Sequence, residues 1–487
     1  MNKLKFSYLR NIRHFPKLGL MTLLLFGSCK KFVTVELPNT RIGAPSVYNN
    51  SASATTALIS IYSQMMNQYQ SSPYMFPCLI PTFTGLSGDE LTNYATLSDQ
   101  IQFFTNSINP ISNGVISSNL WTPAYSYIYQ ANAIITGLES SVSVNEKVKL
   151  QLIGEAKFIR AFHYFYLVNL FGDVPLTTTT DYSVNSSLPR ADKGKVYQQI
   201  VNDLTDAANK LSENYVDLTD TAITTDRVRP NKSAAIALLS RVYLYIKDWK
   251  NAEIQSSTVL ENSSKYNLIS LSQVFLANSE EAIWQLMPDP NTGYDTPEGF
   301  EFILNNVPDV GGNNSNALSN HLLNAFEAGD KRRQIWVDSI IVGTNIYYFP
   351  SKYKIYTSAA TEYSMVLRLA EQYLIRAEAK AQQNDIPGSI ADLNAVRTRA
   401  GLALYSGSAT QAPLLSAILH ERQVELFTEW GHRWLDLKRT LAIDAVMGMP
   451  GDVCKAKGGS WNINSQLYPI PLNEIQNDPK IIQNPGY

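Results

Sequence analysis

The sequence predicts a mainly α-helical fold, in which an antiparallel helical repeat packs against an irregular, loop-rich portion with a few short strands. Three observations indicate this. Apolar residues recur with a 3.6-residue period over long segments, and these segments come in pairs joined by short turns. Two stretches, about 77–114 and 279–363, lack that period and are rich in turn residues and aromatic side chains. We expect the helical repeat to be a rigid scaffold and the two stretches to be variable ligand-binding loops.

The N-terminus has the pattern of an export signal. Five basic residues and no acid precede a short apolar run, Leu18–Phe26, which is too short to span a bilayer. The run closes on Phe26-Gly27-Ser28-Cys29, which resembles a bacterial lipobox although Phe26 is bulkier than usual. We therefore expect residues 1–28 to be a lipoprotein signal peptide and Cys29 to carry the acyl chains that hold the protein on a membrane. An ordinary signal peptide with an incidental cysteine is the alternative.

A polar tether over 29–45 and a single folded domain over 46–487 follow. The segment 153–171 is apolar nearly all round, so we expect it to be buried on both sides, with Gly172 as a C-cap and Pro175 barring continuation. The other predicted helices are 54–68, 120–138, 196–212, 233–246, 249–261, 366–383, 386–400 and 413–430. Short β-like runs are predicted at 282–287 and 336–342.

Two turns carry the repeat at residue level. Asp248 and Asp385 each stand where a side chain can cap the next helix, and a small residue, Ala252 or Ser389, follows four places later. This spacing resembles the turn between the two helices of a tetratricopeptide unit. Generic helical hairpins are the alternative.

Composition excludes several classes of protein. The chain has 40 basic and 42 acidic residues, a net charge of −2, so it lacks the positive field that gathers nucleic acid. Three cysteines cannot form a disulfide framework; Cys78 and Cys454 are expected to be isolated buried thiols, although a pair stays open. Aromatic residues make up 11% of the chain, and 27 of them are Tyr, which suits contact with polar ligands. Five His without a recognisable ligand spacing predict no metal site, and no cofactor is expected.

Motifs along the whole chain carry a family resemblance. In order they are EAKFIRA (155–161), GDVPL (172–176), LRLAEQYLIRAEA (367–379), DLNAVRTRAG (392–401), HERQVEL (420–426), GHRWLDLKR (431–439), YPIP (468–471) and QNPGY (483–487). Together with Cys29 they resemble the SusD/RagB family of outer-membrane nutrient-binding lipoproteins of Bacteroidetes.

The resemblance implies four tetratricopeptide-like units, no enzymatic activity and a partner, a TonB-dependent, SusC-like β-barrel transporter. A SusD-like protein captures oligosaccharide or another nutrient at the cell surface and passes it to that barrel. The chain departs from the family at Lys30-Lys31, because members often carry acidic residues soon after the lipidated cysteine. Surface exposure is therefore implied by the family and not by the local sequence.

Two other functions are weighed against this one. A secreted all-helical polysaccharide-degrading enzyme needs two carboxylates about 5–10 Å apart in a cleft. Asp89-Glu90 is the one pair in the loop stretches that could be considered for this catalytic role. A peptide-binding tetratricopeptide adaptor is the second alternative. A further set of charged residues could be mistaken for a catalytic cluster, but we expect it to be an ion-pair network that pins the last helices. It comprises Glu421, Arg422, Glu425, Arg433 and Asp436.

The candidate ligand contacts are chosen from the two loop stretches. Asp89 and Asn93 are polar residues near Tyr94 that could bind sugar hydroxyls beside a stacking ring. In the second stretch Tyr294 and Phe300 lie among Pro and Gly residues. Trp336 is a further candidate, although core packing explains it equally well. The identity of the glycan is not readable from the sequence.

Overall fold

The computed structural model describes residues 44–67, 76–220, 222–289, 293–308, 310, 314–357 and 359–487. Cys29, the expected signal peptide and most of the expected tether lie outside the described residues. The following account concerns the unit that runs from Val47 to Tyr487.

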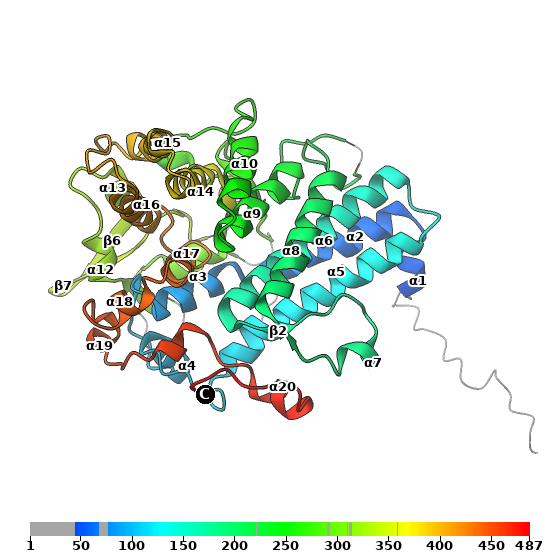
Figure 1. Ribbon diagram of the computed structural model, residues 1–487, viewed down its shortest axis with the longest axis horizontal. Helices are drawn as coiled ribbons and strands as arrows, with labels where there is room; N and C mark the ends of the chain where they lie inside the picture. Colours follow the sequence, from blue (N-terminus) through cyan, green and yellow to red (C-terminus); the bar gives the residue numbers. More distant parts are fainter. Residues whose placement is uncertain are drawn as a thin grey trace, which may run out of the picture. The chain divides into compact units, whose positions relative to one another are not determined.

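A bundle of long helices forms the first half of this unit. Its members are α2 (Ser51–Asn67), α5 (Thr122–Ser140), α6 (Glu146–Phe171) and α8 (Lys193–Lys210). Figure 1 shows them side by side, with α6 in contact with the other three. Asn145 caps the start of α6 by accepting from two backbone N–H groups, and Gly172 ends it with φ +77°. The expectation that this segment is buried on both sides is confirmed, because side chains around the whole circumference of α6 are buried.

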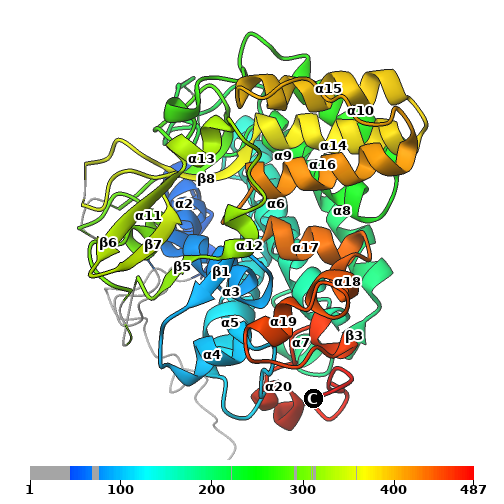
Figure 2. The ribbon, with the colours of Figure 1, turned by 90° about the vertical axis from the view of Figure 1, so that its left-hand side faces the viewer.

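Helical hairpins form the second half. They are α9 (Lys232–Tyr245) with α10 (Trp249–Leu260) and α14 (Leu369–Gln382) with α15 (Ile386–Arg399); α16 (Gln411–Glu425) and α17 (His432–Arg439) follow (Figure 2). Both predicted caps are confirmed: Asp248 accepts from the Asn251 N–H and Asp385 from the Gly388 N–H. The residue before each cap is left-handed, with φ near +62° and +66°, so the two turns repeat in conformation as well as in sequence.

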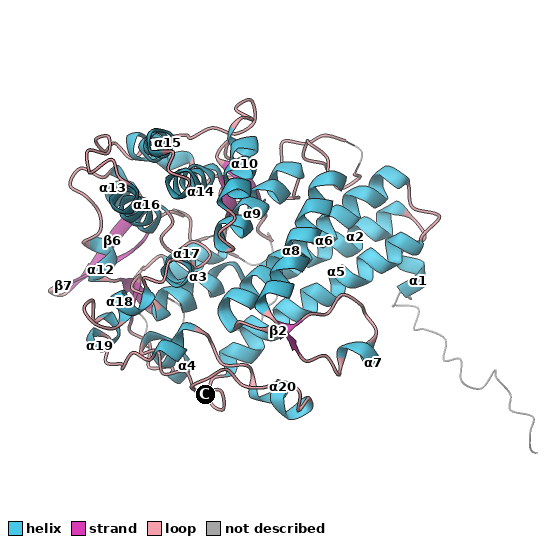
Figure 3. Cartoon of the chain, viewed as in Figure 1, coloured by secondary structure: helices cyan, strands magenta, loops and turns pink. Residues whose placement is uncertain are grey.

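Four two-stranded antiparallel sheets are found among the described residues (Figure 3). They pair β1 (Leu91–Asn93) with β5 (Asn316–Leu318), β2 (Val174–Pro175) with β3 (Arg190–Ala191), β4 (Ala282–Leu286) with β8 (Ser364–Arg368), and β6 (Val337–Val342) with β7 (Asn345–Pro350). The two predicted β-like runs are confirmed as β4 and β6. In β6–β7, Val337 lies opposite Pro350 and Val342 opposite Asn345.

Short helices complete the chain. They are α1 (Ala44–Val47), α3 (Phe76–Ser87), α4 (Ser98–Phe104), α7 (Tyr182–Asn185), α11 (Pro297–Phe302), α12 (Asn320–Leu323), α13 (Lys331–Ile335), α18 (Ile443–Met447), α19 (Val453–Ala456) and α20 (Leu472–Asn477), with the π-helix Ile116–Trp121 and 3₁₀ turns at Leu271–Gln273 and Ile463–Gln466. None of the helices in the described part of the chain is long and apolar enough to cross a bilayer. Cys78 and Cys454 are both buried and are not joined by a disulfide.

Three sequence predictions about these elements are wrong. The stretch 77–114, which was expected to lack helices, contains α3 and α4, because burial of α3 overrides the turn-forming Pro81 and Gly85. The helix expected from residue 366 begins at Leu369, since the preceding residues pair with β4. The helix expected to reach Trp430 ends at Glu425, and Trp430 itself has φ +46°.

The expected ion-pair network is confirmed, and it is larger than the sequence indicated. Arg368 is buried and donates to Glu425 at 2.6 Å, Glu429 at 2.7 Å and Glu281 at 2.9 Å. Burial by itself would raise the pKa of Glu425. The nearby charges of Arg399, Arg368 and Arg332 have the larger effect and hold this pKa well below its ordinary value. These charges tie β8, α13, α15 and α16 together.

The remaining predicted ion-pair members are paired as well. Glu421 pairs with Arg332 at 2.6 Å, Arg422 with Asp436 at 2.7 Å, and Arg433 with Asp89 at 2.6 Å. All of these side chains are buried, so their carboxylates are structural partners and not exposed acid–base groups.

Candidate functional site

A two-stranded sheet joins the two irregular stretches of the chain. β1 pairs with β5, and the Tyr94 N–H then donates to the Ser315 carbonyl at 2.9 Å. The Thr96 N–H and hydroxyl both donate to the Val310 carbonyl. Figure 2 shows β1, β5, β6, β7 and α11 gathered on the same side of the molecule. Residues more than 200 positions apart are therefore brought into one region of the molecule.

Tyr94 stands at the edge of this region. Its side chain is 38% exposed, and its ring meets the Tyr347 ring of β7 edge-on, with centroids 5.3 Å apart and an interplanar angle of 79°. Partial burial, and then Tyr347, raise the pKa of Tyr94, so the phenol stays neutral. One ring supports the other at right angles and leaves part of Tyr94 open to a ligand.

A row of three rings lies on α11 and the loop beside it. Tyr294 and Phe300 have centroids 5.0 Å apart at 36°, and Phe300 and Tyr356 have centroids 5.4 Å apart at 32°. All three side chains are half-buried. We call Tyr294, Phe300 and Tyr356 the aromatic row.

The loop that carries Tyr356 is held by two carboxylates. Asp295 is buried and accepts from the backbone N–H groups of residues 359–362, at 2.9–3.1 Å for three of them. Glu362 accepts from the N–H groups of Lys354 and Ile355 at 2.8–3.0 Å. Because Asp295 is adjacent to Tyr294 and Ile355 to Tyr356, these bonds set the two outer rings of the row.

The central ring depends on a glycine. Thr296 caps α11 by accepting from the Gly299 N–H at 3.0 Å. A Cβ atom on Gly299 would lie 2.6 Å from the Ile355 carbonyl oxygen, which is backbone. Only glycine therefore lets the loop pack this closely against α11, next to Phe300.

Asn314 connects the aromatic row to the Tyr94 side of the region. Its side-chain amide donates to the carbonyls of Phe300, Glu301 and Ile303 at 2.7–3.1 Å, at the end of α11. The next residue, Ser315, accepts from Tyr94. A single turn of chain thus fixes both aromatic groups.

Two buried glutamates lie beneath the aromatic row. Burial raises the pKa of Glu298 to about 7 and that of Glu301 to about 8. Ser364 donates to one Glu298 oxygen at 2.5 Å, whereas neither Glu301 oxygen has a partner with good hydrogen-bond geometry among the described residues. Asn316 and Thr82 are the polar side chains beside Glu301, and they offset only part of the effect of burial.

The structure brings Asn93, Tyr94, Tyr294 and Phe300 into this region, but the side chain of Asn93, expected to bind sugar hydroxyls, is engaged with its own backbone. Its amide donates to the Ala95 carbonyl and its amide oxygen accepts from the Ala95 N–H, both at 3.1 Å. The side chain closes its own turn and so aims the adjacent Tyr94 ring.

Two candidate contacts need correction. Trp336 is 0% exposed, and its Nε1–H donates to the Leu271 carbonyl at 2.9 Å, so it is a core residue that no ligand reaches. Asp89 is 3% exposed, and Arg433 binds both of its oxygens at 2.8 and 2.6 Å. Burial alone would raise the pKa of Asp89, but Arg433 holds it below its ordinary value.

The sequence analysis did not choose Tyr347 or Tyr356. Tyr347 belongs to a run of three consecutive aromatic residues in β7, and that run is the signal that could have identified it. Tyr356 carries no local signal, because its position depends on bonds to Asp295 and Glu362. No cluster of three or more metal-ligating side chains is present within the described ranges.

Comparisons with known proteins point to one family. A model described as "SusD family" matches residues 338–487, and one described as "Starch-binding associating with outer membrane" matches residues 46–244. "SusD-like protein P25" of Formosa agariphila is 24% identical over 94% of this chain and 97% of its own length. "Starch-binding protein SusD" of Bacteroides thetaiotaomicron is 24% identical over 72% of this chain and 75% of its own.

Solved structures of other proteins share this fold. A SusD superfamily protein from Bacteroides vulgatus superimposes with a TM-score of 0.76 at 23% identity, covering 90% of this chain and 99% of that one. A "Laminarin binding SusD-like protein" superimposes with a TM-score of 0.72 at 25% identity, and the match covers 90% of this chain and 100% of that protein's chain.

Proposed function

The chain belongs to the SusD family, and on that premise we propose that it is an outer-membrane glycan-binding lipoprotein. It captures oligosaccharide at the cell surface through the aromatic row and Tyr94, and passes it to a TonB-dependent, SusC-like transporter. Cys29 carries the lipid anchor.

The aromatic row is the observation that carries the proposal. Three half-buried rings, with centroids 5.0 and 5.4 Å apart and tilted by little more than 30°, form a nearly continuous apolar strip. The CH face of a sugar ring is apolar and stacks on such a strip, while its hydroxyls stay hydrated or bind polar groups at the rim. An extended strip of rings suits consecutive sugar units of a chain better than it suits one small molecule, which favours a closed pocket.

The two other functions have less support. For a hydrolase, the carboxylates of Asp89 and Glu90 would have to reach a substrate. The Asp89 carboxylate instead accepts hydrogen bonds from Arg433, and Glu90 is buried with one oxygen accepting from the Thr428 N–H. For a peptide-binding adaptor, the helical repeat would need an open apolar groove. The apolar faces of α14, α15 and α16 instead pack on one another in a common core cluster.

A binding assay tests the glycan site. The purified protein without its lipid is run in native gels that contain starch or laminarin, the two glycans named for relatives. Tyr294→Ala and Tyr356→Ala should each weaken binding by about 1–3 kcal/mol if these rings are hot spots. Tyr129→Ala, an exposed tyrosine on α5, is the matched control. Normal retardation of both row variants, with unchanged melting temperature, would move the glycan site elsewhere.

A second experiment tests the transporter. Tagged protein is purified from outer membranes in mild detergent, and a much larger β-barrel protein should be recovered with it. Recovery of this chain alone would refute delivery to a transporter and would leave glycan binding untouched.

A further inference from the structure

A cavity of about 600 Å³ lies on the helical side of the molecule, on elements that the aromatic row does not use. Its walls come from the end of α6, the start of α8, the turn after α9, α17 and the C-terminal segment. The cationic side chains in its lining are Arg190, Lys193, Lys247, Lys438 and Arg439. Asp173 is the one acidic residue in the lining.

Four of these cations form no ion pair with any described residue. No carboxylate of the described residues lies within 4 Å of the charged nitrogens of Arg190, Lys193, Lys247 or Lys438. Only Arg439 is neutralised, by Glu378 and Asp436.

The bonds that these cations do make are to neutral oxygens. The guanidinium of Arg190 donates to the carbonyls of Asp173, Phe171 and Ile482 and to the amide oxygen of Asn484. The Lys438 ammonium donates to the Asn169 carbonyl. The Asp173 carboxylate accepts from the backbone N–H of Lys193 at 2.8 Å. Positive charge therefore exceeds negative charge in the cavity.

The excess charge affects the lysines themselves. Burial, and then the charge of Lys193, lower the pKa of Lys438 to about 7. Burial also lowers the pKa of Lys193, and Lys247 adds to this while Asp173 opposes it. The buried cations of the ion-pair network differ from those of the cavity, because Arg332 and Arg368 are each surrounded by carboxylates. An anion in the cavity would relieve the repulsion among the lysines.

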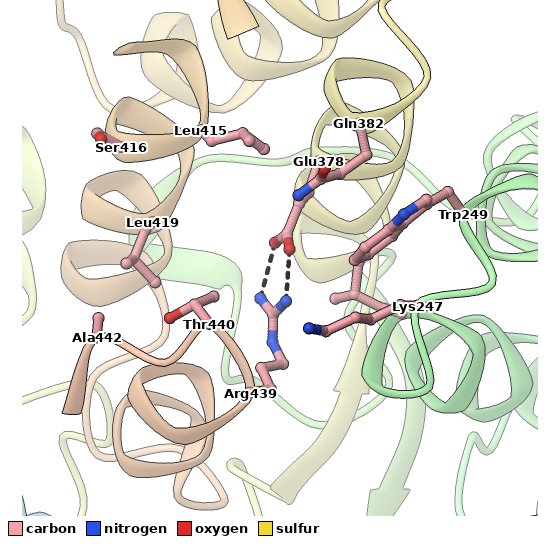
Figure 4. A pocket seen from close by; sticks show the side chains of 11 residues that line it. Lys247, Trp249, Glu378, Gln382, Leu415, Ser416, Leu419, Arg439, Thr440 and Ala442 are labelled. Carbon is pink, nitrogen blue, oxygen red and sulfur yellow. Dashed lines mark hydrogen bonds and ion pairs between the residues drawn. The ribbon is translucent and has the colours of Figure 1, made fainter. Parts of the chain in front are cut away.

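A second pocket, of about 510 Å³, adjoins this cavity and shares Lys247 and Arg439 with it. Figure 4 shows the Lys247 side chain extending toward Arg439, with Trp249 on the same side. The Arg439 guanidinium donates two hydrogen bonds to the Glu378 carboxylate. Since both Glu378 oxygens are engaged by Arg439, they do not compensate Lys247. The second pocket offers an indole wall and apolar side chains for the uncharged body of a ligand.

We propose that the cavity binds the carboxylate or sulfate group of a monosaccharide-sized anionic sugar. Arg190 and Lys438 meet the oxyanion in the interior, and Lys193 and Lys247, which are exposed, meet it at the mouth. The volume is that of a small-molecule site. The site shares no residue with the aromatic row, so it stands or falls independently of the proposed glycan-binding function.

Calorimetric titration tests the proposal with sodium glucuronate, glucose 6-sulfate, sodium sulfate and glucose, at low and constant ionic strength. Both anionic sugars should bind and glucose should not. Lys193→Gln and Lys247→Gln combined should weaken their binding at least tenfold, whereas Lys195→Gln, an exposed lysine of α8 outside the cavity, should leave it unchanged. The two mutated side chains are exposed, so the variant's melting temperature should stay within a few degrees of the parent's.

Three results would overturn the proposal. The first is that neither anionic sugar binds. The second is that they bind equally well to the double variant, which would put the site elsewhere. The third is that sulfate binds while both sugars do not, which would make this a free-ion site.

Discussion

Replacing Gly299 by alanine tests how the aromatic row is built. The new Cβ atom would lie 2.6 Å from the Ile355 carbonyl oxygen, whereas ordinary contacts begin near 3.4 Å. The two backbones must therefore separate by the difference, 3.4 − 2.6 = 0.8 Å. Glu362 holds the N–H groups of Lys354 and Ile355, so the loop cannot shift alone.

The expected cost follows from this overlap. Overpacking of this kind destabilises by roughly 1–3 kcal/mol, and alanine recovers up to about 1 kcal/mol relative to glycine within a helix. We expect Gly299→Ala to lower the free energy of unfolding by about 1–2 kcal/mol. It should also weaken glycan binding, because Tyr356 moves away from Phe300.

Urea unfolding and native-gel affinity for starch and laminarin measure the two effects. Gly114→Ala is the matched control, because the nearest atom to its new Cβ would be a carboxylate oxygen of Asp99 at 3.8 Å. Equal stability and equal affinity for Gly299→Ala and Gly114→Ala would show that the close approach of α11 and the loop is not needed.

Three further predictions concern the buried charges and the anchor. Because burial raises the pKa of Glu301 from 4.5 to about 8, the folded state retains a proton that the unfolded state releases between these values. The free energy of unfolding of the wild type should therefore fall relative to that of Glu301→Gln between pH 5 and 8, by on the order of 1 kcal/mol per pH unit. The same difference in free energy between the two proteins at pH 5 and at pH 8 would contradict this. Arg368→Met removes one partner from Glu425 and Glu429 in the buried network and should cost about 3–5 kcal/mol in urea unfolding, and a loss below 1 kcal/mol would mean that the remaining cations suffice. Cys29→Ser should move the protein from the detergent to the aqueous phase in phase partitioning without changing its melting temperature, and a variant that stays in the detergent phase has another anchor.

The sequence determined the helical scaffold because its determinants are local. Caps at Asp248 and Asp385 lie three residues from the N–H groups they bind, and the apolar period that predicts α6 is contained in one segment. The ion-pair network was also foreseeable in part. Charged side chains recurring on helices next to apolar stripes must either reach solvent or find partners, and Glu421 and Glu425 found Arg332.

The candidate site was foreseeable as a region, and the individual residues were decided by the tertiary structure. Tyr94 and Phe300 belong to one region because β1 pairs with β5 and Asn314 holds the end of α11. Asp89 is not a ligand contact because it pairs with Arg433, which is 344 residues away in sequence. Trp336 is not one because it is buried and donates a hydrogen bond to the Leu271 carbonyl.

Long-range contacts of this kind leave no periodicity in the sequence. A polar or aromatic residue in an irregular stretch has the same local pattern whether it faces a ligand or the core. The sequence by itself therefore determined which segments are helical scaffold and which are loops. Only the packing of α11 against the loop of Tyr356, and the pairing of strands far apart in the chain, decided which rings are left partly exposed.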